Sequence, residues 1–137
     1  MEEALDDLLA ETRLSLKRGS TPHAQLRLFI HTFVAFQSRE RRRLALLERE
    51  TINLSGEQRQ RIASLRNEYA HCLGSIITPE LAGSWLPGST MQVLTNAVIG
   101  MLQSLPLWNE GEAALPFQEV EDQLTRIIAG AITAAKR

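Results

Sequence analysis

The uncharged stretch at residues 81–109 constrains the fold more than any other feature of the sequence. The chain carries 15 Lys and Arg residues and 16 Asp and Glu residues, yet none lies between Glu80 and Glu110. Glycines, prolines and the amides Gln92, Asn96 and Gln103 interrupt the stretch, which excludes a membrane span. A helix formed here has no charged face to offer to water, so we expect it to be covered on more than one side.

Composition narrows the class of protein. At 137 residues, with 44% apolar and 23% charged, the chain is long enough for one globular domain with a real core. A net charge of −1 argues against bulk electrostatic binding of nucleic acid. Cys72 is the single cysteine and the first residues are acidic, so we expect no disulfide, no secretory signal and a cytoplasmic location.

Apolar residues recur at helical spacing along almost the whole chain, and no alternation typical of strands occurs. We therefore predict an all-α fold, a single domain over residues 1–137 built from six helices. The predicted ranges are about 2–18, 22–36, 38–50, 55–78, 89–105 and, after a loop at 109–116, the segment from Val120 to Ile132.

Several predicted helix ends carry residues of capping type. Gly19 is expected to follow the first helix in a left-handed conformation, and Ser20 or Thr21 to cap the second. Ser55 is expected to cap the fourth helix without a complete capping box. Pro106 is tolerable only near the end of the fifth helix, which is predicted to run through residue 105.

The segment 90–107, which contains the fifth predicted helix, is apolar on two sides, since Val93 and Gly100 lie away from Leu94 and Met101. Small residues at 129–131 and 134–135 of the last helix permit close approach of another helix. We predict a homodimer joined by a four-helix bundle of the last two long helices of each chain. The alternative is a core helix buried within a monomer. The residues predicted at the interface are Val93, Ala97, Gly100, Leu105, Trp108, Leu124, Ile127, Ile128 and Ala131.

No catalytic or metal-binding motif is present. His23, His31 and His71 are scattered without the i, i+4 spacing of a helical metal site, and one cysteine cannot complete a zinc site. His71 and Cys72 are adjacent, so on a helix they point about 100° apart. We predict neither an enzyme nor a cofactor nor a metal; the competing hypothesis is a small helical enzyme that acts through His71 or Tyr69.

Aromatic residues cluster on two predicted helices. Phe29, Phe33 and Phe36 share one face of the second, and Tyr69 lies one turn from Cys72 on the fourth. These side chains either fill a core or surround an apolar cavity with a few polar tips. The candidates for such polar tips are the Tyr69 hydroxyl, His31 or His71, and Gln103.

The basic run at residues 39–43 also has two interpretations. In the first, it is a solvated face paired with the acidic residues Glu40, Glu48 and Glu50. In the second, it contacts a phosphate-bearing ligand.

Four segments in order resemble the C-terminal regulatory domain of TetR-type transcriptional regulators, in the branch that responds to lipid-like or acyl-CoA ligands. The segments read QLRLFIHTFVAF, RRRLALLERE, NLSGEQRQRIASLRNEYAHCLGSII and VLTNAVIGMLQSLPLWNEG…LPFQEVEDQLTRIIAGAI. The positions that match the family pattern are Leu54, Ser55, Glu57, Gln58, Arg59, Ile62, Leu65, Arg66, Tyr69, Gly100, Met101, Leu102, Leu105, Pro106 and Trp108.

The resemblance implies an effector-binding and dimerisation domain that senses a small apolar molecule, such as a lipid or acyl-CoA. It also implies that DNA is read by a helix-turn-helix domain absent from this chain, that effector binding shifts the first helix, and that no membrane is involved. The implied pocket residues are Phe29, Phe33, Leu47, Leu65, Tyr69, Cys72, Val98 and Met101, with Arg42, Arg43 or Arg66 as phosphate partners. The alternative is a helical dimeric scaffold or adaptor with a filled core and no ligand.

Overall fold

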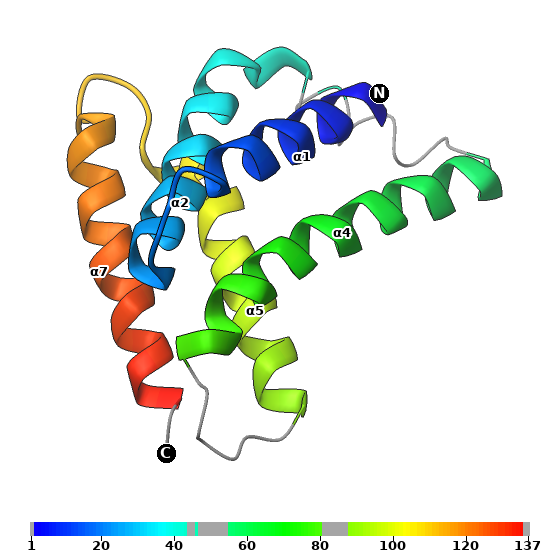
Figure 1. Ribbon diagram of the computed structural model, residues 1–137. Helices are drawn as coiled ribbons and strands as arrows, with labels where there is room; N and C mark the ends of the chain where they lie inside the picture. The colour runs from blue at the N-terminus through cyan, green and yellow to red at the C-terminus, as the bar shows by residue number, and fades with distance from the viewer. Residues whose placement is uncertain (1, 44–45, 47–54, 81–87, 136–137) are drawn as a thin grey trace.

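The computed structural model describes residues 2–43, 46, 55–80 and 88–135, and their regular structure is entirely helical (Figure 1). The all-α prediction is therefore confirmed. The helices are α1 (Glu2–Leu16), α2 (Pro22–Arg39), α4 (Gly56–Glu80), α5 (Gly88–Gln103), α6 (Leu105–Trp108) and α7 (Phe117–Ala135). Residues 41–43 and 46 are also helical, as predicted for 38–50; residues 44–45 and 47–50 of that prediction lie outside the described residues.

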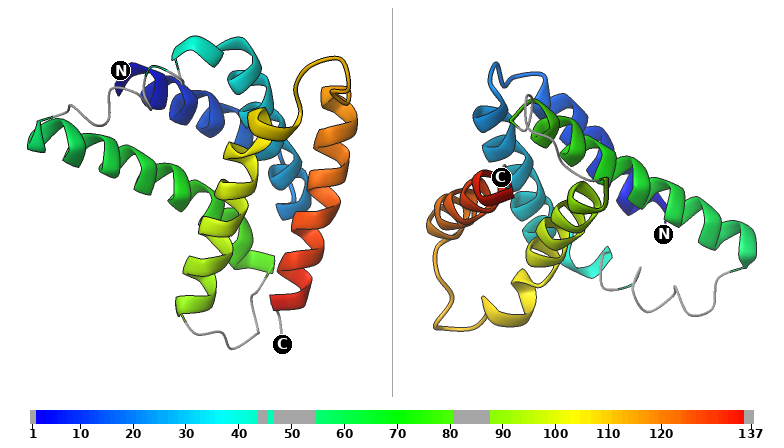
Figure 2. Two further views of the ribbon diagram at one scale, coloured as in Figure 1. Left: turned by 180° about the vertical axis from the view of Figure 1, so that it is seen from behind. Right: turned by 90° about the horizontal axis from the view of Figure 1, so that it is seen from below.

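Helix α2 lies at the centre of the arrangement and contacts α1, α4, α5 and α7. Figure 1 shows α1 and α4 on one side of it and α7 on the other, and both views of Figure 2 place α5 near α7. Because α2 is surrounded in this way, its apolar face must be wide. It buries Leu26, Phe29, Ile30, Phe33 and Phe36.

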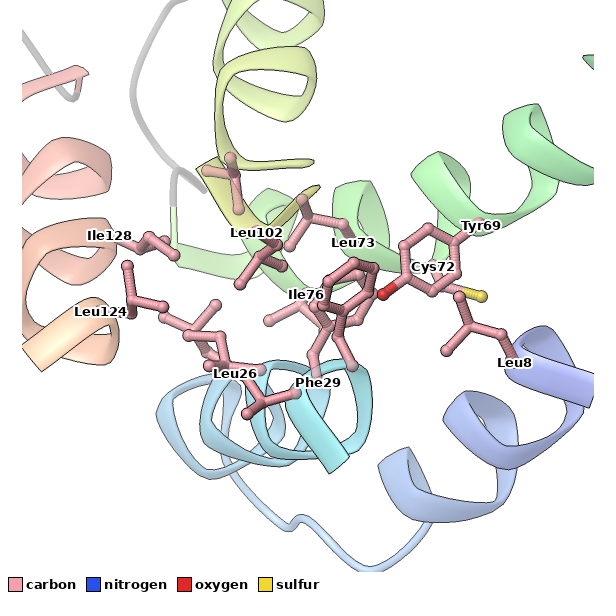
Figure 3. Close-up of a cluster of buried hydrophobic side chains, with 14 of the residues drawn as sticks. Leu8, Leu26, Phe29, Tyr69, Cys72, Leu73, Ile76, Leu102, Leu124 and Ile128 are labelled. Carbon is pink, nitrogen blue, oxygen red and sulfur yellow. The ribbon is translucent and has the colours of Figure 1, made fainter. Parts of the chain in front are cut away.

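The core fills the space between α2 and the helices around it. Leu73 and Ile76 of α4, Leu102 of α5 and Phe29 of α2 come together in this cluster (Figure 3). All four of these side chains are almost completely buried. Helix α7 adds Ile128, and with Leu8 of α1 and Leu105 of α6 all six described helices contribute to one contiguous cluster.

Gly19 differs from the prediction of a left-handed cap. The positive φ among the described residues belongs to Gly111, at 78°, and not to Gly19. A Cβ added to Gly19 would instead lie 2.8 Å from Cγ and 3.0 Å from the backbone nitrogen of Gln25. Gly19 is therefore needed because Gln25 of α2 lies too close to leave room for a side chain, and not for an unusual backbone conformation.

The structure shows which residue caps α2 and adds a second hydrogen bond to the cap of α4. Thr21, not Ser20, caps α2, and its hydroxyl oxygen accepts a hydrogen bond from the Ala24 amide at 3.1 Å. At the start of α4 the Gln58 amide donates to the Ser55 hydroxyl at 3.3 Å, and the Ser55 amide donates to the Gln58 side chain at 3.1 Å. This is a complete capping box, which two reciprocal hydrogen bonds define.

Helix α5 ends at Gln103, two residues earlier than predicted, and the one-turn helix α6 follows. Pro106 lies at the beginning of α6. Because proline has no amide hydrogen and its ring clashes with the carbonyl four residues earlier, it cannot continue α5 past the turn at Ser104. The break allows the chain to start the loop that leads to α7.

Candidate functional site

A cavity of about 330 Å³ opens between α1, α2, α4 and α5. Its described lining is mixed, with apolar side chains from α1, α2 and α4 and polar side chains from α4 and α5. The lining residues are Leu5, Leu8, Phe33, Leu65, Arg66, Asn67, Tyr69, Ala70, Asn96, Ile99, Gly100 and Gln103. We call this space the α1–α5 cavity.

The polar wall of the α1–α5 cavity follows directly from the helical repeat of α5. Asn96, Gly100 and Gln103 are spaced i, i+4 and i+7, which places them on one side of the helix. Leu94, Val98 and Leu102 lie on a different side and are buried in the core. The uncharged helix therefore has a core face and a face with amides that meets the cavity, while Val93 and Ala97 lie on a further, exposed side.

Tyr69 is the most unusual residue of the lining. Its ring lies 4.9 Å from that of Phe29 and 6.3 Å from that of Phe33, centroid to centroid. Its hydroxyl is buried and has no hydrogen-bond partner among the described residues. Burial raises the pKa of this hydroxyl well above its usual value, and the neighbouring Cys72 raises it further. Figure 3 shows the hydroxyl oxygen directed toward the α2 side of the core.

The structure places the predicted pocket residues in three environments. Phe33, Leu65 and Tyr69 line the α1–α5 cavity. The remaining described ones do not: Phe29, Cys72 and Val98 pack into the buried core, and Met101 lines a different hollow between α5 and α7. Leu47 lies outside the described residues.

The residues considered as polar groups of the pocket also lie in different places. Gln103 lines the α1–α5 cavity as proposed. His71 is exposed, and the exposed ring of His31 makes a 2.9 Å contact with Glu121 of α7. Neither histidine reaches the cavity.

Sequence reasoning missed the α1 contribution and most of the amide-lined wall. Leu5 and Leu8 were not among the residues predicted for the pocket, whereas in the structure they line the cavity. Asn96 carries the clearest available signal, since an amide on the uncharged helix α5 faces either solvent or a polar cavity. Which of the two holds depends on the neighbouring helix, and sequence periodicity does not give that.

A second feature is an apolar surface shared by α5, α6 and α7. Val93, Trp108 and Ile127 are 67%, 54% and 56% exposed, and Ala97 and Gly100 are also exposed. An apolar hollow of about 330 Å³ lies between α5, α6 and α7, and both Trp108 and Ile127 line it. We call this surface the α5–α7 face.

Three residues predicted at the subunit interface are buried within the single chain, although one of them, Leu124, also lines the hollow. Leu105, Leu124 and Ile128 are 3%, 6% and 0% exposed and belong to the core of the single chain. They have little or no surface left for a second subunit, because they lie on the sides of their helices that face α2 and its neighbours. Ala131 is half-buried and packs against the core.

The basic run pairs mostly with acidic residues. Arg39 contacts Glu11 at 2.6 Å and Arg43 contacts Asp7 at 2.7 Å, so both arginines join α2 and the segment after it to α1. Hydrogen bonding to these carboxylates raises the pKa of both guanidinium groups. Neither arginine, nor Arg42, lines the α1–α5 cavity.

Within the described ranges, no group of three or more His, Cys, Asp or Glu side chains is arranged to hold a metal ion. The helices described there are also too short or too polar to cross a membrane.

The comparison with protein families settles the family. The model of the tetracyclin repressor-like C-terminal domain matches residues 19–132, which is most of the chain. The chain belongs to this family. Membership supports an effector-binding and dimerisation role in a regulator, and domains of this family are typically non-enzymatic. No curated protein matches the chain.

Proposed function

We propose that the chain is the effector-binding and dimerisation module of a TetR-type transcriptional regulator, with the α1–α5 cavity as its effector site. The observation that carries the proposal is a cavity of about 330 Å³ lined by four helices, one of whose wall residues, Tyr69, has a buried hydroxyl with no partner among the described residues. Buried polar groups are normally paired, and exceptions often mark a site that an absent ligand completes. We assign the recognition of DNA to a separate helix-turn-helix domain.

The size and lining of the cavity favour a small molecule with an apolar body. A cavity of roughly 150 Å³ is enough to bind benzene, so this cavity has room for a ligand of about twice that size. Leu8, Phe33 and Leu65 supply the apolar wall. This supports the sensing of a small apolar effector.

The contact between the cavity and α1 supports a mechanism for the switch. Leu5 and Leu8 of α1 line the cavity, so an effector there touches α1 directly. An effector that binds one position of α1 better than another shifts the equilibrium between the two positions. Such coupling is typically about 1–3 kcal/mol.

We propose the α5–α7 face as the homodimer interface. It is apolar and exposed in the single chain, and the small residues Ala97 and Gly100 lie within it. Exposed apolar patches of this kind mark interaction sites, and small residues allow helices to approach closely. The same face repeated about a two-fold axis gives a bundle of α5 and α7 from each subunit.

The effector proposal is tested by thermal denaturation in the presence of fatty acids, acyl-CoAs, drugs and dyes. A true effector should stabilise the chain by about 2.7 kcal/mol at a hundredfold excess over its Kd. Filling the cavity from opposite walls, with Ala70→Trp on α4 or Asn96→Trp on α5, should abolish the response. Ala63→Trp is the matched control, because Ala63 is an exposed residue of α4 outside the cavity.

Circular dichroism shows whether each variant retains its helices. A panel in which no compound stabilises the folded chain would contradict the effector proposal and support the alternative of a helical dimeric scaffold. An equal response of the unmodified chain and both filled variants would move the effector site elsewhere.

A further inference from the structure

We propose that the α1–α5 cavity selects an amphipathic carboxylate, whose apolar body lies against α1 and α2 and whose single negative charge lies beside Arg66. The inference rests on the proposed effector role of the cavity and adds the chemical class of the ligand. It follows from how polar and apolar groups are distributed in the lining.

The lining has an apolar floor and a polar rim. Leu8, Phe33 and Leu65 are buried, whereas Arg66 and Gln103 are exposed to solvent. A ligand that fits this distribution has an apolar body and one polar end. The polar end lies near the rim, where it keeps part of its hydration.

Arg66 determines which sign of charge the cavity favours at the polar end of the ligand. Among the described residues of the lining it is the one charged side chain, and it makes no hydrogen bond or ion pair with the described part of the chain. The acidic residue two positions later, Glu68, contacts Arg13 of α1 at 3.5 Å instead. An anion at the rim therefore gains an unopposed cation, and a cationic ligand is repelled.

Three amide side chains complete the rim. Asn67 of α4 and both Asn96 and Gln103 of α5 line the cavity together with Arg66. Each amide has an NH₂ group that donates hydrogen bonds, and a guanidinium group donates two parallel ones to a carboxylate. The rim is thus rich in donors, which matches an acceptor with two oxygens.

The same geometry argues for one charge and not several. Arg43 is engaged with Asp7 and Glu40, at 2.7 Å and 3.4 Å, and it does not line the cavity. A ligand with several phosphates, such as an acyl-CoA, would find a single lining cation among the described residues. A body of about twelve non-hydrogen atoms, roughly two benzene rings in size, matches the volume.

The test compares three ligands that share one body and differ in the end group: decanoate, decanamide and decylamine, each titrated calorimetrically into the chain at neutral pH. We expect decanoate to bind at least about tenfold more tightly than decanamide, since charge-assisted hydrogen bonds exceed neutral ones. Decylamine should bind more weakly still. Added salt should reduce the advantage of decanoate, because the charge on Arg66 is solvent-exposed.

Substitutions locate the charge effect. Arg66→Gln should remove the preference for decanoate and leave the affinity for decanamide within about twofold of its original value, because the neutral end gains little from the cation. Arg66→Lys keeps a charge and should restore part of the preference. Arg126→Gln on α7 is the matched control: it removes an exposed arginine that does not line the cavity and should change nothing.

The outcomes separate this inference from the proposed function. Decanamide or decylamine binding as tightly as decanoate, with loss of binding in Ala70→Trp, would overturn the carboxylate assignment and leave the effector site standing. A decanoate preference that survives Arg66→Gln would also overturn it. Failure of these three ligands and of the wider panel would contradict the effector site itself.

Discussion

The Tyr69 hydroxyl group is buried without a hydrogen-bond partner among the described residues. Leaving a polar group in this state costs about 1–3 kcal/mol of folding free energy. The ring itself is well placed, with its centroid 4.9 Å from that of Phe29 and the two ring planes tilted by 31°. The residue therefore combines a favourable aromatic contact with an unfavourable polar one, and the two can be separated by substitution.

Tyr69→Phe keeps the ring and removes the hydroxyl. We expect the ligand-free chain to become more stable by about 1 kcal/mol, measured by denaturant unfolding, because no hydrogen bond is lost. Tyr69→Leu is the control for the ring and should destabilise. A clear loss of stability in Tyr69→Phe would mean that the hydroxyl has a partner in the folded chain.

The raised pKa of Tyr69 predicts a pH dependence at the alkaline end. The stabilising contribution is fully present below the ordinary pKa of 10.0 and is lost as the pH rises toward the higher folded value, because the unfolded chain releases its proton first. The free energy of unfolding should fall by up to about 1.4 kcal/mol per pH unit above pH 10 relative to Tyr69→Phe.

Tyr69 is the single tyrosine of the chain, so the ultraviolet absorbance of tyrosinate reports it alone. The absorbance change should occur at higher pH in the folded chain than in the chain unfolded by urea. Coincident titrations in both states would contradict the burial of the hydroxyl.

At the scale of elements, α1 is held on α2 by two kinds of polar contact. A buried pair joins Thr32 to Ser15, whose hydroxyl oxygens are 2.9 Å apart. The ion pairs of Arg39 and Arg43 with α1 lie at the surface, where salt screens them. The buried pair should therefore determine how firmly α1 is docked when salt is high.

Ser15→Ala tests that pair. It leaves the Thr32 hydroxyl without its partner and should lower the free energy of unfolding by about 1–2 kcal/mol. The double variant Ser15→Ala/Thr32→Val should cost less than the sum of the two single changes, since neither hydroxyl is then left unpaired. Additive losses, measured by denaturant unfolding, would show that the two hydroxyls do not depend on each other.

At the scale of the whole molecule, the α5–α7 face exposes large apolar side chains that a second subunit could remove from water. Val93, Trp108 and Ile127 are each more than half exposed, and the charged groups nearest in sequence flank α5 without entering it. A monomer would leave this apolar area in water. A second copy of the chain removes it on both subunits at once.

Val93→Asp places one charge in the middle of that face. We expect a dimer in the unmodified chain at micromolar concentration and a helical monomer in the variant, because a buried unpaired carboxylate is strongly unfavourable. Sedimentation velocity gives the mass and circular dichroism the helix content. Ala63→Asp on the exposed side of α4 should remain dimeric. A monomeric unmodified chain would contradict the interface.

The sequence by itself determined the helices, because helix formation depends on periodicity and caps within a few neighbouring residues. It predicted the all-α class, most helix ranges and the helix starts at Thr21 and Ser55. It failed at Gly19, where the reason for glycine is a contact with Gln25 of the next helix. It also placed the end of α5 too late, although Pro106 was the available signal.

Only the tertiary structure decided what each face of a helix meets. Periodicity places Val93 and Leu94 about 100° apart on α5 but does not say which side is covered, since the covering helices come from distant parts of the chain. Packing put Leu94 in the core, left Val93 exposed and turned Gln103 toward the cavity. It likewise placed Ile128 inside the protomer and Arg66 at the rim, because burial is a property of the assembled helices and not of any one of them.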